Sequence, residues 1–459
     1  MSTLKHLLPA AALAVTCGLL ASCAVSPLSD DWIPARPLER TTSTWRPPVL
    51  TDASPDQAPL PAPDGPRDAL ALRDAVALAL IRSPDLASFA YDVRAAEARS
   101  VQAGLSPNPM VTVMAENLLE SSQGDDRFRE VTVQLSQVIE LAGKRDKRLA
   151  LAQAQQRLAA WDYEARRLEV ATLTAQRHVA VIAAQQRVEL AERMLKLAEQ
   201  THEIATQRAK AGVAPTSEQD KALVRVSVER VRLDTARHKL SAARQALAST
   251  WGQSIASFRQ AVGDLDVSLP VPAVESLLTA AADHPRAARW ADEVDERRRA
   301  VELARAKGVP DVTAGAGVRT FPDANDAAAL LEFSIPLPLN DRNQGGVLEA
   351  RYALAKTTAQ SRAAEAMLHQ ELSAAHAEMA AAVFALRLLR DEAMPAARSA
   401  HQAARDAFAT GRTDLLNVLD AERTLVEVEA QLIDARESQH TAAAKIEGLT
   451  ARPLSEMGR

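Results

Sequence analysis

Two stretches of the chain alternate apolar and polar residues with a period of two, as strands with one apolar face do. The apolar positions are Val131, Val133, Leu135 and Ile139 in the first stretch and Leu331, Phe333, Ile335, Leu337 and Leu339 in the second. Since a weaker pattern and a polar loop precede each stretch, we expect four strands, at about 109–118, 129–139, 310–320 and 329–339. One face of these strands suits lipid and the other water, and each strand has the length that a tilted bilayer crossing needs.

Long helices are predicted after each pair of strands. Neither Gly nor Pro occurs between Gly143 and Gly212, and a helix of that length would extend roughly 100 Å. A return helix is expected over 216–251. The second half repeats the pattern over 347–410, with an interruption at Pro395, and over 412–447. Apolar residues at coiled-coil spacing indicate that these helices pack side by side in a long bundle.

The chain matches itself. Residues 83–113 align with residues 284–314 without a gap, and two later blocks match in the same order. We therefore predict a tandem duplication, with a first repeat at 69–260, a second at 261–451 and a short tail at 452–459. Each repeat contains a short helix, a Pro bend, a second helix, two strands, a very long helix, a Gly turn and a returning helix.

The first residues have the features of a secretory signal. A lysine precedes an apolar stretch, and the segment ending Leu20-Ala21-Ser22-Cys23 resembles a bacterial lipobox, which predicts a signal peptide at 1–22 and a lipid-modified Cys23. An ordinary signal peptide is the alternative. Ala24 is not the aspartate that retains lipoproteins in the inner membrane, which favours outer-membrane delivery. Residues 23–68 are rich in proline and are expected to form an extended tether. No later run of 18 or more apolar residues was found, so further membrane crossings are expected to use strands.

Composition excludes several classes of function. Aromatic residues make up only 3% of the chain and hydrophobic residues 47%, which is typical of a helix-rich protein. Positive and negative charges are nearly balanced, with a net charge of -5 and no basic stripe, so no nucleic-acid binding is expected. Both cysteines lie in the first 23 residues, which leaves no Cys-based metal cluster in the remainder.

No catalytic residues, metal site or cofactor are predicted. The chain has no paired catalytic constellation and no Gly-rich phosphate loop, so it is not expected to be an enzyme. His369 and His376 are one heptad apart and too distant to hold one ion. Met110 and Met114 share a strand face, where packing is the expected role.

Four membrane strands cannot close a barrel, because an open sheet edge in lipid leaves backbone groups without partners. The chain must therefore assemble with copies of itself. Two copies would give eight strands with a filled interior, and three would give twelve strands with room for a lumen.

Four segments carry a resemblance to a known family: "AGLSPNP", "LAGKR", "IPLPLNDRNQG" and "TGRTDLLNVLDAERTLVEVEAQL". Over about 69–451 the chain resembles the TolC-like outer membrane efflux proteins, particularly the heavy-metal branch of CzcC-like and CusC-like proteins. The resemblance implies a mainly α fold with a membrane β part. Three chains would form a twelve-stranded β-barrel and a periplasmic α-helical barrel in the outer membrane of a Gram-negative bacterium. The implied partners are a periplasmic adaptor and an inner-membrane resistance-nodulation-division (RND) pump.

The resemblance also assigns roles to single residues. Gly212 and Gly411 would lie at the periplasmic tips of the helical hairpins, where the duct narrows. The gate positions of the family fall at Glu218, Asn417 and Asp420, which a merely solvated tip would also expose. The joins between barrel and helices, here called the elbows, are expected at Gly143 in the first half and at Pro336 and Pro338 in the second.

The expected function is that of an exit duct in a tripartite efflux system, and by resemblance the cargo is a heavy-metal cation. One alternative is a duct for drugs, other organic compounds or type I secretion. An alternative of another class is a periplasmic coiled-coil adaptor or scaffold lipoprotein, which two hairpins and two strand pairs in tandem disfavour.

Overall fold

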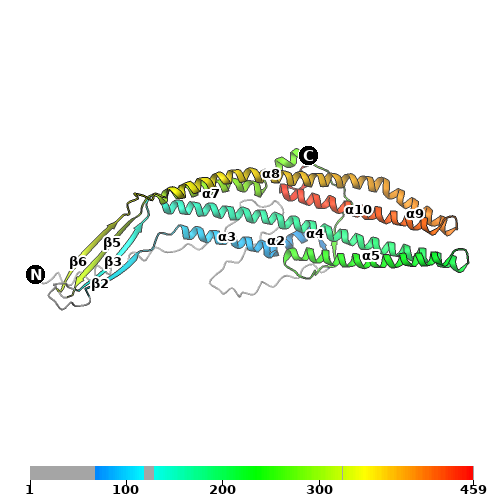
Figure 1. Cartoon of the computed structure of the whole chain (residues 1–459), viewed down its shortest axis with the longest axis horizontal. Coiled ribbons are helices and arrows are strands. Elements are labelled where there is room, and N and C mark those ends of the chain that lie inside the picture. The colour runs from blue at the N-terminus through cyan, green and yellow to red at the C-terminus, as the bar shows by residue number, and fades with distance from the viewer. Residues whose placement is uncertain (1–67, 118–128, 323, 458–459) are drawn as a thin grey trace. The chain divides into compact units, whose positions relative to one another are not determined.

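A computed structural model of the chain describes residues 68–117, 129–322 and 324–457 (Figure 1). The predicted signal peptide, Cys23 and all but the last residue of the predicted tether lie outside the described residues. The same order of elements recurs in both halves. The first half contains α2 (Leu72–Arg82), α3 (Pro84–Ala103), β2 (Met110–Glu116), β3 (Glu130–Ile139), α4 (Lys144–Lys210) and α5 (Thr216–Ala248). The second contains α6 (Val274–Ala281), α7 (Pro285–Lys307), β5 (Val312–Phe321), β6 (Asp326–Ser334), α8 (Gln344–Leu388), α9 (Met394–Ala409) and α10 (Leu415–Thr450).

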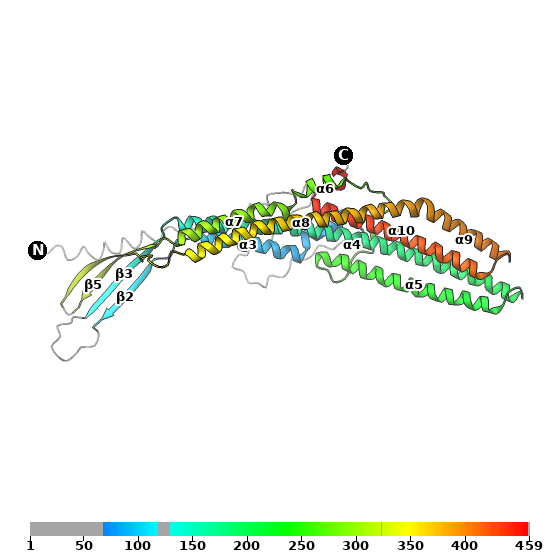
Figure 2. The ribbon, with the colours of Figure 1, turned by 45° about the horizontal axis from the view of Figure 1, so that its top comes forward.

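The helix predicted between Gly143 and Gly212 is confirmed, because α4 is continuous over 67 residues. It contacts α3, α5, α7 and α10, and Figure 2 shows α5 beside α4 and α9 beside α10. The predicted interruption of the second long helix is also present. Pro395 has no N–H to give to the carbonyl of Asp391, and a π turn, Leu389–Ala393, separates α8 from α9 at this point.

The four predicted strands form one antiparallel sheet in the order β2-β3-β5-β6. β2, β3 and β5 lie within about two residues of their predicted bounds. The predicted bounds of the fourth strand were wrong. We expected a strand over 329–339, and β6 spans Asp326–Ser334. Pro336 and Pro338 cannot donate to a sheet ladder, so pairing stops before them. Ile335, Leu337 and Leu339 are therefore exposed side chains of the connection to α8 and not the end of a strand.

A two-stranded parallel sheet was not anticipated. It joins β1 (Ala69–Ala71) to β4 (Gln260–Val262), so that the segments at the starts of the two repeats lie side by side. Side chains from the long helices bind the carbonyls of these segments. His178 contacts the Leu70 carbonyl at 2.9 Å, and His376 contacts the Pro272 carbonyl at 3.1 Å. His376 thus has a hydrogen-bond partner within the chain.

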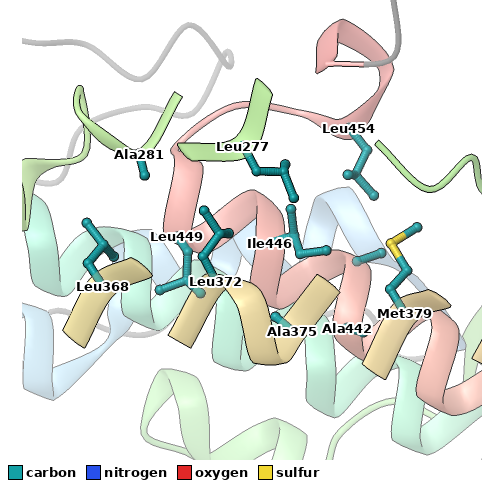
Figure 3. Packing of buried hydrophobic residues seen from close by; sticks show 11 residues of the cluster. Leu277, Ala281, Leu368, Leu372, Ala375, Met379, Ala442, Ile446, Leu449 and Leu454 are labelled. Atoms are coloured by element: carbon teal, nitrogen blue, oxygen red, sulfur yellow. The ribbon is translucent and has the colours of Figure 1, made fainter. Parts of the chain in front are cut away.

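Alanine and leucine seams form the hydrophobic core. One cluster joins α6, α8, α10 and the short α11 (Leu454–Met457), and Figure 3 shows how its side chains interdigitate. Leu277 of α6 lies against Leu372 of α8 and Ile446 of α10, all three fully buried. At about 25 cal/mol per Å² of apolar surface removed from water, side chains of this size stabilise the bundle by roughly 2 kcal/mol each.

Ion pairs fasten the first repeat to the second. Arg157 of α4 binds Asp292 and Asp295 of α7 at 2.8 and 2.7 Å, and Arg289 of α7 binds Asp162 of α4 at 2.7 Å. These pairs are largely exposed, so they contribute little free energy and serve mainly to fix the register of α4 on α7.

The segment Gln344–Ala409 is apolar and long enough by composition to cross a membrane, although only 22% of its most apolar part is buried. The segment contains no unbroken run of 18 apolar residues, so it did not stand out in the sequence. The most apolar part of this segment is instead rich in alanine and contains at most two charged residues. Its apolar surface is mostly uncovered in a single chain.

Candidate duct surface and hairpin tips

The two faces of the four-stranded sheet differ in chemistry. On one face Arg319 donates to the Thr132 hydroxyl at 3.1 Å and forms an ion pair with Glu130 at 2.9 Å. Gln134 and Glu332 are hydrogen-bonded on the same face. These side chains form a polar network across three strands, and such a network suits contact with water.

The opposite face is apolar and exposed. Val111 and Val113 of β2 and Leu331 and Phe333 of β6 are between 65% and 79% exposed. The predicted alternation is therefore confirmed for the sheet itself. One face offers apolar side chains to a lipid-like surrounding, and the other offers hydrogen-bonding groups.

Met110 and Met114 lie on the polar face, because their cross-strand partners are Ser136 and Thr132. Packing was the expected role for these methionines, but they are 58% and 50% exposed. Among the described strands β2 pairs with β3 alone and is an edge strand, in agreement with the exposure of these side chains.

Both elbows use a residue in the left-handed region. Gly143 has φ 65° and precedes the first turn of α4, and Asn343 has φ 56° and precedes the first turn of α8. Asn343 also donates from Nδ2 to the Ala304 carbonyl at 2.6 Å. The prediction that Pro336 and Pro338 form the second elbow was therefore incomplete: the prolines end the strand, and Asn343 makes the turn. The signal was present, because Asn is among the residues that most readily adopt this conformation.

The first elbow is tied to the second half by charge. Lys144 is only 8% exposed and binds Asp311 at 2.7 Å, and Asp311 also accepts from the Leu141 backbone N–H at 2.9 Å. Arg148 binds Glu140 at 2.6 Å. These contacts fix the angle at which the sheet meets α4.

The hairpin tips turn at glycines, as the sequence predicted. Gly212 and Gly411 have φ 72° and 76°, values that side chains other than glycine rarely adopt. Of the predicted gate residues, Asn417 and Asp420 are exposed and Glu218 is half-buried. Among the described residues, no hydrogen bond or ion pair joins Glu218 to Asn417 or to Asp420. The role of these residues as a gate stays a prediction.

Other residues join the two tips directly. Phe408 of α9 is 1% exposed and packs in a cluster with Ala205, Leu415 and Val418. The guanidinium of Arg208 in α4 lies 4.4 Å from the centre of the Phe408 ring and donates to the Phe408 carbonyl at 2.5 Å. Sequence reasoning missed this contact, because the two residues come from different repeats and share no motif.

Two buried carboxylates lie beyond this cluster. Glu422 of α10 is fully buried and binds Arg225 of α5 at 3.3 Å, and Arg225 also binds Glu229, which is 1% exposed, at 2.9 Å. Burial raises the pKa of Glu422, an effect that the neighbouring Arg225 opposes. One oxygen of Glu422 has no hydrogen-bond partner.

The sequence contains a signal for the buried position of Glu422, which sequence reasoning missed. Leu415, Val418, Glu422 and Leu425 follow the spacing of a coiled-coil seam, so a carboxylate replaces an apolar residue at a seam position.

The described residues contain no group of three or more His, Cys, Asp or Glu placed to hold a metal ion. The arrangement offers instead a two-faced sheet, two elbows and two hairpins joined near their tips. These features suit a conduit more than a site of chemistry.

Comparison with known proteins gives a consistent family match. The family model of the outer membrane efflux protein matches residues 75–253 and 279–452. The cobalt-zinc-cadmium resistance protein CzcC of Cupriavidus metallidurans is 30% identical over 390 residues, which cover 84% of this chain and 92% of that protein. The nickel-cobalt-cadmium resistance protein NccC of Alcaligenes xylosoxydans xylosoxydans is 28% identical over 62% of this chain and 64% of its own length. A solved structure of CusC, described in terms of transmembrane channel formation, superimposes with a TM-score of 0.71 at 17% identity, covering 83% of this chain and 91% of that one.

Proposed function

The chain belongs to the outer membrane efflux protein family, and from that premise we propose that it is the exit duct of a tripartite efflux system. The observation that carries the proposal is the open sheet with one apolar and one polar face, joined at both elbows to long helical hairpins. The polar face would line a water-filled path, and the apolar face would meet lipid.

The duct is a trimer in this proposal. β2 and β6 are edge strands whose free N–H and C=O groups would pair between neighbouring copies. Three copies make a twelve-stranded barrel, and the helices that follow make an α-helical barrel in the periplasm. The uncovered apolar surface of α8 supports this assembly, because contact between subunits would remove it from water.

The cargo is a heavy-metal cation. The support is the similarity to CzcC and NccC, whose names state resistance to cobalt, zinc, cadmium and nickel. This chain would be a passive path, and an inner-membrane RND pump would supply the energy. A periplasmic adaptor would dock on the hairpin tips, where Glu218, Asn417 and Asp420 would face the pore in the trimer and form the gate.

Cys23 is proposed as the site of lipid attachment, which would anchor the chain in the outer membrane by an acyl group as well as by its barrel. Incorporation of labelled palmitate into the wild-type protein and its absence from Cys23→Ser would support the anchor. Equal labelling of both proteins would exclude it.

Two experiments test the duct and its cargo separately. Purified protein in detergent should have the mass of three chains and give stepwise conductance in planar bilayers. A monomer without conductance would refute the duct.

A deletion strain tests the cargo. It should lose tolerance to cobalt, zinc, cadmium or nickel and regain that tolerance on complementation. Unchanged metal tolerance together with lost tolerance to organic compounds would refute the metal cargo alone.

A further inference from the structure

A cavity of about 110 Å³ lies where α8, its π turn and α10 meet the segment between β4 and α6. Three arginines, Arg387, Arg390 and Arg436, line it together with one carboxylate, one hydroxyl and three apolar side chains, which are Asp266, Ser268, Val383, Leu386 and Leu432. The cavity is remote in sequence from the sheet, the elbows and the hairpin tips, and nothing in the proposed duct function requires it.

The arginines of this cavity have spare capacity for hydrogen bonding. In the part of the chain that the structure describes, Arg436 forms an ion pair with Asp266, and Arg390 binds its neighbour Asp391 at 2.9 Å. Arg387 makes no hydrogen bond or ion pair with any described residue. Three guanidinium groups therefore face two carboxylates, and the excess positive charge adjoins the cavity.

The Arg390–Asp391 pair does not neutralise this excess. Its side chains are 57% and 51% exposed, and exposed pairs of this kind contribute little. An incoming anion could therefore displace Asp391 from Arg390 at a small cost in free energy.

The apolar residues make the cavity more selective than a charged surface would be. Leu432 is buried, and Val383 and Leu386 are half-buried. An ion such as phosphate has no apolar part to cover these side chains, and it would lose part of its hydration shell where it contacts them. A carboxylate on a short aliphatic stem would cover them and present its two oxygens to the arginines, whose planar donors match a carboxylate well.

The backbone at the cavity is itself irregular. Arg390 lies within the π turn before Pro395, and such turns occur frequently at functional sites. Pro395 accounts for the presence of the turn, but it does not require arginines beside it.

We propose that this cavity binds a carboxylate carried on a short aliphatic stem. The ligand is either a free dicarboxylate or a glutamate side chain of an acidic peptide, since both present the same group.

The test measures binding to the intact assembled protein in detergent at constant ionic strength. Glutarate and the peptide acetyl-Glu-Ala-Glu-amide are the probes for the two sources, and inorganic phosphate and acetyl-Gln-Ala-Gln-amide are the comparison ligands. Glutarate or the Glu peptide should bind, and the double variant Arg387→Gln/Arg390→Gln should weaken that binding about tenfold or more, because each lost bond joins two charged groups. Thermal melting confirms that the variant is folded.

The matched control is Arg193→Gln/Arg237→Gln, which removes two exposed arginines of α4 and α5 that also pair with carboxylates. It should leave binding unchanged. Binding of glutarate alone would identify a free acid as the ligand, and binding of the Glu peptide would identify an acidic protein segment. Equal binding of phosphate or of the Gln peptide, or binding that the double variant does not weaken, would overturn the proposal.

Discussion

Glu422 illustrates how a single residue can oppose the packing around it. It occupies a seam position between two hairpins, where a leucine would pack without cost. Among the described residues its ion-pair partner is Arg225 of the other hairpin, and Arg225 also pairs with Glu229, which Arg232 binds as well. A buried pair of this kind stabilises little by itself, but removing one partner leaves uncompensated charge in the interior.

Arg225→Leu should therefore destabilise the hairpin pair by about 3 kcal/mol, since it leaves the buried carboxylate of Glu422 without its counterion from the other hairpin, whereas Glu229 keeps its ion pair with Arg232. If these contacts hold the tips together, the variant should also conduct more current in planar bilayers. The double variant Arg225→Leu/Glu422→Leu should recover most of the stability lost by the single one. Wild-type melting and conductance in Arg225→Leu would contradict this account.

His284 makes the stability of the fold depend on pH, and a substitution at this one residue can test its share. Its side chain accepts from the Arg286 N–H at the start of α7, and it is 3% exposed. Burial, aided by the charge of Arg286, lowers the pKa of His284 to about 4, while the Gly448 backbone and Glu371 oppose the shift.

Because the folded chain keeps His284 neutral, this group stabilises the fold fully above pH 6.5 and progressively less as pH falls toward about 4. The loss can reach about 3 kcal/mol. His284→Ser keeps a cap for the helix but cannot titrate, so its stability should fall less than that of the wild type between pH 7 and pH 4. Parallel loss of stability in both proteins would show that His284 does not carry the effect.

At the scale of elements, periodicity predicted the long helices and three of the four strands. The helices are long enough for Ala and Leu spacing to dominate any local exception. The end of β6 was misplaced because alternation continues through Ile335, Leu337 and Leu339, although Pro336 and Pro338 remove the ladder donors there. The parallel pairing of β1 with β4 could not be predicted, because three-residue strands from distant segments leave no periodic pattern.

The elbows allow a comparison of two glycines. Gly143 has a positive φ and Gly345 lies in the first turn of α8, and an added Cβ would meet no atom within 4 Å at either. Gly143→Ala should therefore cost about 1 kcal/mol through the backbone alone. Gly345→Ala should instead stabilise the protein by up to about 1 kcal/mol, since alanine favours helix over glycine. Thermal melting of the purified variants should show a lower melting temperature for Gly143→Ala and a higher one for Gly345→Ala. Equal shifts in melting temperature would contradict the assigned backbone conformations.

For the whole molecule, the sequence indicated that one chain is incomplete, because four strands cannot close. The structure adds a second reason. Leu348, Tyr352, Phe384 and Leu388 lie within about 40° of one another around α8 and are all exposed. Exposed alanines fill the positions between them, and this face lies opposite the buried residue Leu368. The candidate gate could not be assembled from the sequence or from the single chain, because in the proposed trimer its residues come from different copies.

Charge placed on this face of α8 should prevent assembly. Phe384→Glu/Leu388→Glu puts two carboxylates where the proposed subunits meet, and burying them without counterions would cost several kcal/mol per subunit. The variant should retain its helical circular dichroism but run as a single chain in detergent and give no conductance. Gln360→Glu adds charge at an exposed position on the flank of the same helix and should assemble normally. A wild-type trimer in the double variant would show that this face of α8 is not a subunit contact. A wild-type protein with the mass of two chains would replace the twelve-stranded barrel with an eight-stranded one, too narrow for a duct.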